Sequence, residues 1–443
     1  AALAALTTGW SGGWAADAEE DAALVAAGVI TVTATRNPTP AFEYPGSVSV
    51  IERATIEDLL PSSISDVFSE TPGVRFDGGP RRTGETPSVR GIEGEGVVIL
   101  YDGVRQSFLS GHDGRFFIEP DLLAAAEVVR GPASALYGSG ALGGVIALRT
   151  LNASDLLADG ETMGVRLRGG YQGVSDEWAA GGTIFGRSAD GRFEGIASLS
   201  WRDAGDIRLG DGNTLQADDE ILSGLVKASA RLTSALKAEV SWVAYRDDAI
   251  EPNNGQGLTT GDLVDKKVTS DTWRAGVSYA PGGNWIDAGL IAYINRGEVK
   301  EAELASARVV DRKVDSFGFV FDNRTRFSLG DSAGVVFTYG GEYYEDEQTG
   351  TDNMSGDGSR GGVPDATART YGLFAQAEAS LETGFGKFSL IPAIRYDDFR
   401  NEGDGVEAND GAWSPKVGLS WRPADWLLFY GNYAEAFRAP SFN

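Results

Sequence analysis

His112 is the only histidine in this sequence. It stands in the stretch SFLSGHDGRFFIEPDLL, which runs from Ser107 to Leu123. A neutral imidazole is a good metal ligand, so the stretch could bind a metal carried by a flat molecule. The alternative is a solvated loop histidine that binds no metal. The neighbours that could approach or stack on a flat ligand are Phe108, Gly111, Gly114, Phe116 and Phe117.

The amino-acid composition argues against several other kinds of site. The chain has no cysteine, which excludes disulfides, thiolate metal sites and thiol nucleophiles. Its 38 basic and 64 acidic residues leave a net charge of -26, which argues against binding nucleic acid. The 60 glycines among 443 residues, with many aromatic residues, favour an all-β protein rich in turns. The length allows two or more domains.

The part of the chain that begins near Met163 has the alternation of β-strands. In LKAEVSWVAY, Val240 and Trp242 share one face and Glu239 and Ser241 share the other. The sequence has no run of about 18 apolar residues that would form a spanning helix. Membrane-spanning β-strands also alternate, so a barrel remains possible. A soluble β-sandwich alternates as well, and the pattern alone does not separate the two.

The connections between these segments favour the barrel. Short turns recur at 188–192, 233–235, 281–284, 330–334, 382–386 and 422–425. Long polar loops are expected between them, at 203–220, 247–270, 296–314, 345–369 and 400–411. Short turns on one rim and long loops on the other are typical of outer-membrane barrels. Aromatic residues fit two interfacial belts: Trp201, Trp273, Trp285, Trp421, Trp426 and Tyr430.

The segments from 151 to 443 count to about thirteen strands. Bacterial barrels have even strand numbers, and an open sheet would leave unpaired edges in lipid. We therefore expect a partial barrel that lacks its C-terminal strands. The first fifteen residues read as the remainder of a signal peptide, with a small-x-small end at 13–15.

Residues 46–150 are predicted to form a compact α+β domain. Capping-box patterns at Thr55 and Ser63 predict two helix starts. A third helix is expected in EPDLLAAAEVV, where Pro120 suits the first turn. GVVILYDGVRQ predicts a buried strand followed by an Asp-Gly turn. Residues 16–45 would be a spacer that contains the β-prone run VITVTAT.

Several motifs of this domain, in order, resemble the plug of TonB-dependent receptors. They are DVFSETPGV (66–74), SVRG (88–91), YDGV (101–104) and EVVRGPASALYGSGALGGVIALRT (127–150). The resemblance implies an all-β transmembrane barrel of 22 strands with an N-terminal α+β plug. It makes Val29, Ile30, Thr31, Val32, Thr33, Ala34 and Thr35 a candidate TonB box, which pairs with TonB. It also implies that Arg90 and Arg130 lock the plug to barrel carboxylates, with Glu342 as a candidate partner.

YAEAFRAPSFN, at 433–443, resembles the FRAP box of haem and haemoglobin receptors within that family. The turn rhythm places this motif at the long-loop rim. The resemblance therefore implies a haem site in which His112, at the plug apex, ligates the iron. Its other candidate residues are Phe116, Phe117, Phe437, Arg438, Ala439 and Pro440.

The expected protein is a monomeric receptor in the outer membrane of a Gram-negative bacterium. It would import haem as a transported ligand, in contact with lipid, using TonB with ExbB and ExbD, and taking haem free or from a carrier protein. It would not be an enzyme and would need no catalytic cofactor. A ferric-siderophore or cobalamin receptor is the alternative. A passive porin would leave the plug motifs unexplained, and a hydrolase would need a nucleophile motif such as G-x-S-x-G near His112.

Overall fold

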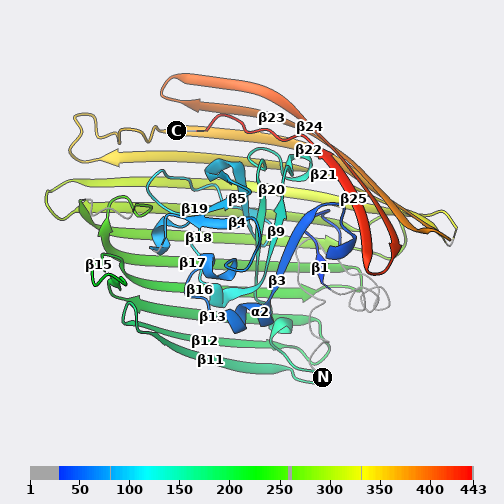
Figure 1. Ribbon diagram of the computed structural model, residues 1–443, viewed down its shortest axis with the longest axis horizontal. Coiled ribbons are helices and arrows are strands. Elements are labelled where there is room, and N and C mark those ends of the chain that lie inside the picture. The colour runs from blue at the N-terminus through cyan, green and yellow to red at the C-terminus, as the bar shows by residue number, and fades with distance from the viewer. Residues whose placement is uncertain (1–28, 80, 258–261, 331, 442–443) are drawn as a thin grey trace.

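The computed structural model describes residues 29–79, 81–257, 262–330 and 332–441, and it shows a curved sheet around a small domain (Figure 1). The predicted signal segment, 1–15, lies outside the described residues. Among the described residues, the sheet has thirteen antiparallel strands in chain order, as expected. They are β11 (Met163–Gln172), β12 (Glu177–Arg187), β13 (Phe193–Ala204), β16 (Asp218–Arg231), β17 (Leu236–Pro252), β18 (Leu263–Tyr279), β19 (Ala288–Glu303), β20 (Val309–Ser328), β21 (Ala333–Asp352), β22 (Ala366–Thr383), β23 (Gly386–Gly403), β24 (Val406–Ala424) and β25 (Leu427–Ala434). No helix in the described portion of the chain is long and apolar enough to cross a membrane.

Side chains alternate across this sheet as the sequence predicts. Val240 and Trp242 point outward and are 56% and 39% exposed, whereas Ser241 and Arg274 point inward and are buried. The registers place Trp242 opposite Trp273, near one edge of an outward-facing apolar band. Trp285 lies beyond the other edge, beside the short turns. Two aromatic belts thus border the band, as expected for a lipid-facing surface.

The strands are longer on the long-loop side than the sequence predicts. On β20 the outward apolar residues begin at Phe317, but the strand starts eight residues earlier, at Val309. Much of the polar stretches 247–270, 296–314, 345–369 and 400–411 therefore forms strand and not loop. Their outward side chains are mostly polar or charged because they lie beyond the apolar band, while the backbone ladder of hydrogen bonds continues. Of the predicted loop 203–220, residues 205–217 do leave the sheet, and they contain a hairpin of β14 (Ile207–Arg208) and β15 (Thr214–Leu215).

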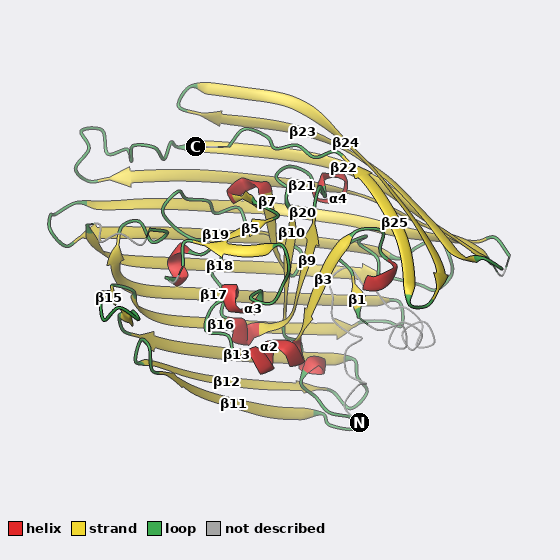
Figure 2. Ribbon diagram, in the orientation of Figure 1, coloured by secondary structure: helices red, strands yellow, loops and turns green. Residues whose placement is uncertain are grey.

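The small domain contains all the short helices, which Figure 2 shows in red inside the curved sheet. Its five-stranded sheet has the order β3-β9-β10-β7-β8, with β7 and β10 parallel. Those strands are β3 (Ser47–Glu52), β9 (Leu123–Arg130), β10 (Gly144–Thr150), β7 (Val97–Tyr101) and β8 (Val104–Arg105). The remaining elements are β1 (Ile30–Thr31), β2 (Thr39–Pro40), β4 (Val74–Asp77), β5 (Thr86–Val89), β6 (Ile92–Glu93), α2 (Arg53–Leu59), α3 (Ile64–Val67), α4 (Ser134–Tyr137), η1 (Ala41–Glu43), η2 (Arg82–Gly84), η3 (Gly94–Gly96), η4 (Pro120–Leu122) and η5 (Ala153–Asp155).

Some of the local predictions in this domain are confirmed and others are not. The capping box at Ser63 and Asp66 forms and starts α3. The helix near Thr55 exists, but it begins at Arg53. The predicted helix after Pro120 is wrong: only one 3-10 turn forms, and residues 123–130 become strand β9. Since β9 is paired on both sides, by β3 and β10, tertiary pairing overrides the helix preference of its alanines.

Candidate functional site

His112 lies on an exposed loop of the small domain, and its backbone is held by the barrel wall. Gln256, just beyond β17, donates its backbone N–H to the His112 carbonyl at 3.3 Å and its side-chain amide to the Asp113 carbonyl at 2.7 Å. Ser110 Oγ accepts the His112 N–H at 3.1 Å. The imidazole is therefore presented to solvent from a fixed backbone.

The residue after His112 is anchored by a buried ion pair. Asp113 and Lys266 are 1% and 0% exposed, and Lys266 Nζ lies 2.9 Å from Asp113 Oδ1. Lys266 also lies 2.9 Å from Glu251 and 3.5 Å from Glu301, on the two strands beside its own. One lysine of β18 thus gathers three carboxylates and ties the His112 loop to three barrel strands.

Gly114 explains why the loop can lie so close to the body of the domain. A Cβ at this position would lie 2.7 Å from both the backbone N and the backbone O of Glu85. Gly114 N donates to Thr83 O, and Arg115 N donates to Glu85 O at 3.0 Å. The Arg115 guanidinium is buried and donates to Val97 O at 2.9 Å, and burial lowers its pKa to about 10. Both sides of His112 are therefore fixed to rigid structure.

The predicted aromatic component of the site is wrong. Phe116 is 4% exposed and packs against Phe76 in the core of the small domain. Phe117 is 6% exposed and packs between Phe108 and Tyr245. These side chains are apolar and lie beneath the loop, where burial stabilises them most. They support the His112 loop from below and are not available to stack on a ligand.

The FRAP residues are placed against the small domain and not beside His112. The Phe437 carbonyl accepts the Gly140 N–H at 3.0 Å, and Ala439 N donates to Ser139 Oγ at 2.9 Å. Arg438 pairs with Glu95 at 2.9 Å. Phe437 also stacks on Phe399 of β23, and the Pro440 carbonyl accepts from Asn401. This segment connects the end of β25 to the loop after α4.

A cavity of about 140 Å³ separates the FRAP segment from the loop that leads to His112. Its wall includes Leu109, three residues before His112, and Pro440 of the FRAP segment. The charged and phenolic groups that line it are Glu95, Arg105, Arg115, Tyr344, Asp346 and Arg438. His112 itself does not line this cavity, so the structure does not bring His112 and the FRAP segment into one site.

The residues predicted to lock the small domain to the barrel do not contact one another. Arg130 donates to Ser47, Ser49 and Pro72 of its own domain, and Arg90 is exposed. Glu342 instead pairs with Arg395 at 2.9 Å. Within the residues that the structure describes, no carboxylate pairs with Arg90 or Arg130, so the predicted arginine–Glu342 contacts are wrong.

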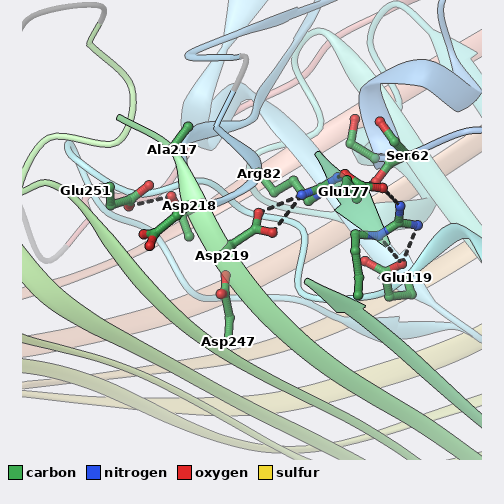
Figure 3. Close-up of polar contacts among 12 residues, drawn as sticks. Ser62, Arg82, Glu119, Glu177, Ala217, Asp218, Asp219, Asp247 and Glu251 are labelled. Atoms are coloured by element: carbon green, nitrogen blue, oxygen red, sulfur yellow. Dashed lines mark hydrogen bonds and ion pairs between the residues drawn. The ribbon is translucent and has the colours of Figure 1, made fainter. Parts of the chain in front are cut away.

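The contacts that join the small domain to the wall centre on Arg82 (Figure 3). Arg82 lies between Asp219, at 2.6 Å, and Glu177. Arg202 of the wall in turn binds Glu177 and, at 2.9 Å, Glu119 of the small domain. All five side chains are at most 13% exposed. This Arg82 network is an interdigitated set of buried charges from both domains.

The predicted TonB box lies inside the molecule. Ile30 and Thr31 form the short strand β1, but the chain then turns, so the run is not a continuous strand. Residues from Thr31 to Thr35 are at most 7% exposed. Glu127 of β9 accepts the Thr31 hydroxyl at 2.6 Å and the Thr33 N–H at 3.1 Å. Burial raises the pKa of Glu127 by more than these hydrogen bonds lower it.

The chain between this segment and β3 is braced against the wall. Glu43 pairs with Lys387 of β23 at 2.7 Å and with Arg422 of β24 at 2.8 Å. Tyr44 accepts a hydrogen bond from Lys416 at 2.9 Å, and Asn432 donates to the Pro45 carbonyl at 3.0 Å. Three adjacent strands thus hold residues 43–45, which we term the brace.

Family comparisons agree with this architecture of a small domain and a curved sheet. Residues 40–145 match the TonB-dependent Receptor Plug Domain, and residues 154–443 match the TonB dependent receptor-like, beta-barrel family. The chain is a TonB-dependent receptor by family. The small domain is accordingly its plug, and the curved sheet belongs to its barrel.

Curated relatives of this receptor include the hemin receptor of Yersinia enterocolitica, 32% identical over 420 residues. That alignment covers 94% of this chain and 60% of the relative. The heme/hemopexin utilization protein C of Haemophilus influenzae is 29% identical, with 93% and 63% covered. The chain thus spans about three fifths of the length of the curated relatives it matches.

Solved structures share the fold of this receptor. The hemophore receptor HasR of Serratia marcescens, solved with its hemophore HasA and heme, has a TM-score of 0.80 at 21% identity, with 91% of this chain and 65% of HasR covered. The FrpB iron transporter of Neisseria meningitidis has a TM-score of 0.77 at 21% identity, with 89% and 66% covered. Both align along plug and barrel alike.

Proposed function

We propose that this receptor imports haem across the outer membrane of a Gram-negative bacterium and that His112 is an axial ligand of the haem iron. The observation that carries the proposal is the presentation of His112. It is the only imidazole of the chain, exposed on a loop fixed by Gln256 and by the buried Asp113–Lys266 pair. A solvated histidine of no function has no need of a buried anchor at the next residue.

The names of the relatives support this choice of ligand. Hemin and heme/hemopexin proteins match almost all of the chain, with identities of 29–32%. Haem commonly takes an axial histidine. Iron–siderophore complexes have no open axial position of this kind, so a siderophore receptor gives no reason for a fixed exposed imidazole. No step of this function requires catalysis.

Replacing His112 tests the proposal. In the full-length protein, His112→Ala should weaken haem binding and change the Soret band, because one iron–nitrogen bond is lost. Asn213→Ala, at an exposed position of the β14–β15 hairpin, is the control and should leave the Soret band in place. An identical spectrum and affinity for His112→Ala and the unchanged protein would favour a siderophore as the ligand.

We also propose that residues 29–35 are the TonB box and that they pair as a strand with periplasmic TonB. The run is β-prone and precedes the plug. Val32→Pro should abolish uptake of haem into the periplasm without changing haem binding at the surface, because proline removes an N–H needed for pairing. Val32→Ala keeps that N–H and should take up haem normally. Normal uptake by Val32→Pro would remove the assignment.

A further inference from the structure

The candidate TonB box has its backbone donors engaged by one plug carboxylate. Glu127 Oε2 accepts the Thr31 hydroxyl at 2.6 Å, the Val32 N–H at 3.2 Å and the Thr33 N–H at 3.1 Å. A strand added to a partner's sheet needs these same backbone N–H groups. While Glu127 holds them, the segment cannot pair with another chain.

The carbonyls of the same segment are engaged from other directions. Tyr137 of α4 donates to Thr33 O at 2.8 Å, and Gln376 of β22 donates to Thr35 O at 2.9 Å. Arg324 of β20 donates to Arg36 O at 2.9 Å. The plug therefore holds the donors and the Thr33 carbonyl, while the wall holds the Thr35 carbonyl and the adjoining Arg36 carbonyl, so the segment is sequestered at the boundary between them.

Glu127 is a buried carboxylate that depends on hydrogen bonds. It is 4% exposed in the centre of the plug sheet, on a strand paired with Val50 of β3 and Ala147 of β10. Among the residues that the structure describes, no lysine or arginine forms an ion pair with it. A buried charge without a counter-ion must be stabilised by hydrogen bonds, and here these come from residues 31–33.

We propose that Glu127 is the latch that keeps the TonB box closed, and that breaking its bonds to residues 31–33 makes the segment available for strand pairing. The inference rests on the proposed function only in naming TonB as the partner. Glu127 is a positioning residue: it contacts the segment and not the transported ligand. The latch is local, because its three donors lie within three consecutive residues, and it can open without unfolding the plug sheet.

The test measures exposure of the segment directly. None of these 443 residues is a cysteine, so Val32→Cys adds the one thiol of this part of the protein, and labelling of the protein without Val32→Cys is subtracted as background. Val32 is 7% exposed, and maleimide should label Val32→Cys slowly in the full-length protein. Adding Glu127→Ala should raise the labelling rate by about tenfold or more, because bonds to a charged acceptor are lost. Glu127→Gln keeps one acceptor oxygen and should give a smaller rise.

Two controls separate release of the latch from damage to the plug. Glu85 is another plug carboxylate that is 4% exposed, but it binds Ser65, so Glu85→Gln should leave Val32→Cys protected. Val145→Cys, on β10 and fully buried, should stay unlabelled with Glu127→Ala. If Glu127→Ala exposes Val145→Cys, the plug has unfolded. The labelling of Val32→Cys is then compared between the Glu127→Gln protein and the unchanged protein. Unchanged Val32→Cys labelling in a folded Glu127 variant would overturn the latch.

Binding of the isolated periplasmic domain of TonB distinguishes the latch from the TonB-box assignment. The Glu127→Ala protein should capture this domain without haem, and the unchanged protein should not. Faster labelling without capture would keep the latch and remove TonB as the partner of the segment. If Val32→Pro abolishes uptake but Glu127→Ala does not change the labelling of Val32→Cys, the TonB-box assignment is kept and the role of Glu127 as its latch is wrong.

Discussion

Replacing Arg82 with alanine should loosen the plug from the barrel wall more than the loss of either arginine predicted from the sequence. Arg82 of the plug lies between Glu177 and Asp219, and both carboxylates are nearly inaccessible to water. Removing Arg82 leaves Asp219 without a cation, although Glu177 keeps Arg202, and breaking a buried charge pair in this way costs about 3–5 kcal/mol. The full-length Arg82→Ala protein should lose plug protection in limited proteolysis and unfold at a lower temperature.

Arg130→Ala is the matched control, since Arg130 binds only hydroxyls and one carbonyl of the plug. Its loss removes ordinary hydrogen bonds and should have a clearly smaller effect. Arg82→Lys keeps the charge but cannot span Glu177 and Asp219 in the same way, and it should fall between the two. Equal protease resistance of Arg82→Ala and the unchanged protein would show that the Arg82 network does not hold the plug.

The second large effect is expected at Lys266. Lys266→Met has a similar volume, but it leaves Asp113 and Glu251 without their cation, again at about 3–5 kcal/mol. Asp113 is the residue after His112, so the loop should lose its anchor. We expect a lower unfolding temperature together with a fall in haem affinity of about tenfold or more, measured by Soret titration.

Lys267 provides the control at the next position. It pairs with Asp248 at 2.6 Å, but both side chains are more than half exposed, and such surface pairs contribute about 0–1 kcal/mol. Lys267→Met should therefore change neither the unfolding temperature nor haem binding. The anchoring role of Lys266 would be wrong if the two methionine variants behaved alike.

The barrel could be predicted from sequence because its signals are local. Alternation of Val240 and Trp242 with Ser241 requires no knowledge of distant residues. Strand ends were less predictable, since a charged outward residue such as Lys313 on β20 reads as loop although its backbone is paired. The helix expected after Pro120 failed for the opposite reason. Alanine-rich residues 123–130 are a strand only because two distant strands flank them.

The candidate site could likewise be predicted only in part from the sequence. His112 could be found because it is the only histidine, and its exposure follows from a Gly-flanked loop. Its anchor could not be found, because Asp113 and Lys266 are 153 residues apart and neither lies in a motif. Arg82 was missed for the same reason. Motif resemblance instead pointed to Arg90 and Arg130, which have no carboxylate partner among the described residues.

The brace at residues 43–45 has a mechanical consequence. Along the chain, tension applied to the candidate TonB box passes through Glu43, Tyr44 and Pro45 before it reaches β3, and three barrel strands hold these residues. Beyond the brace the chain enters β3 at Ser47, paired with Arg130 at the end of β9 that leads into α4. Force on β3 is applied at Ser47, the end where it pairs with Arg130 of β9. The hydrogen bonds between β3 and β9 then break one after another, so this strand pair resists the force only weakly. The brace, and not the sheet, should therefore set the force at which the plug yields.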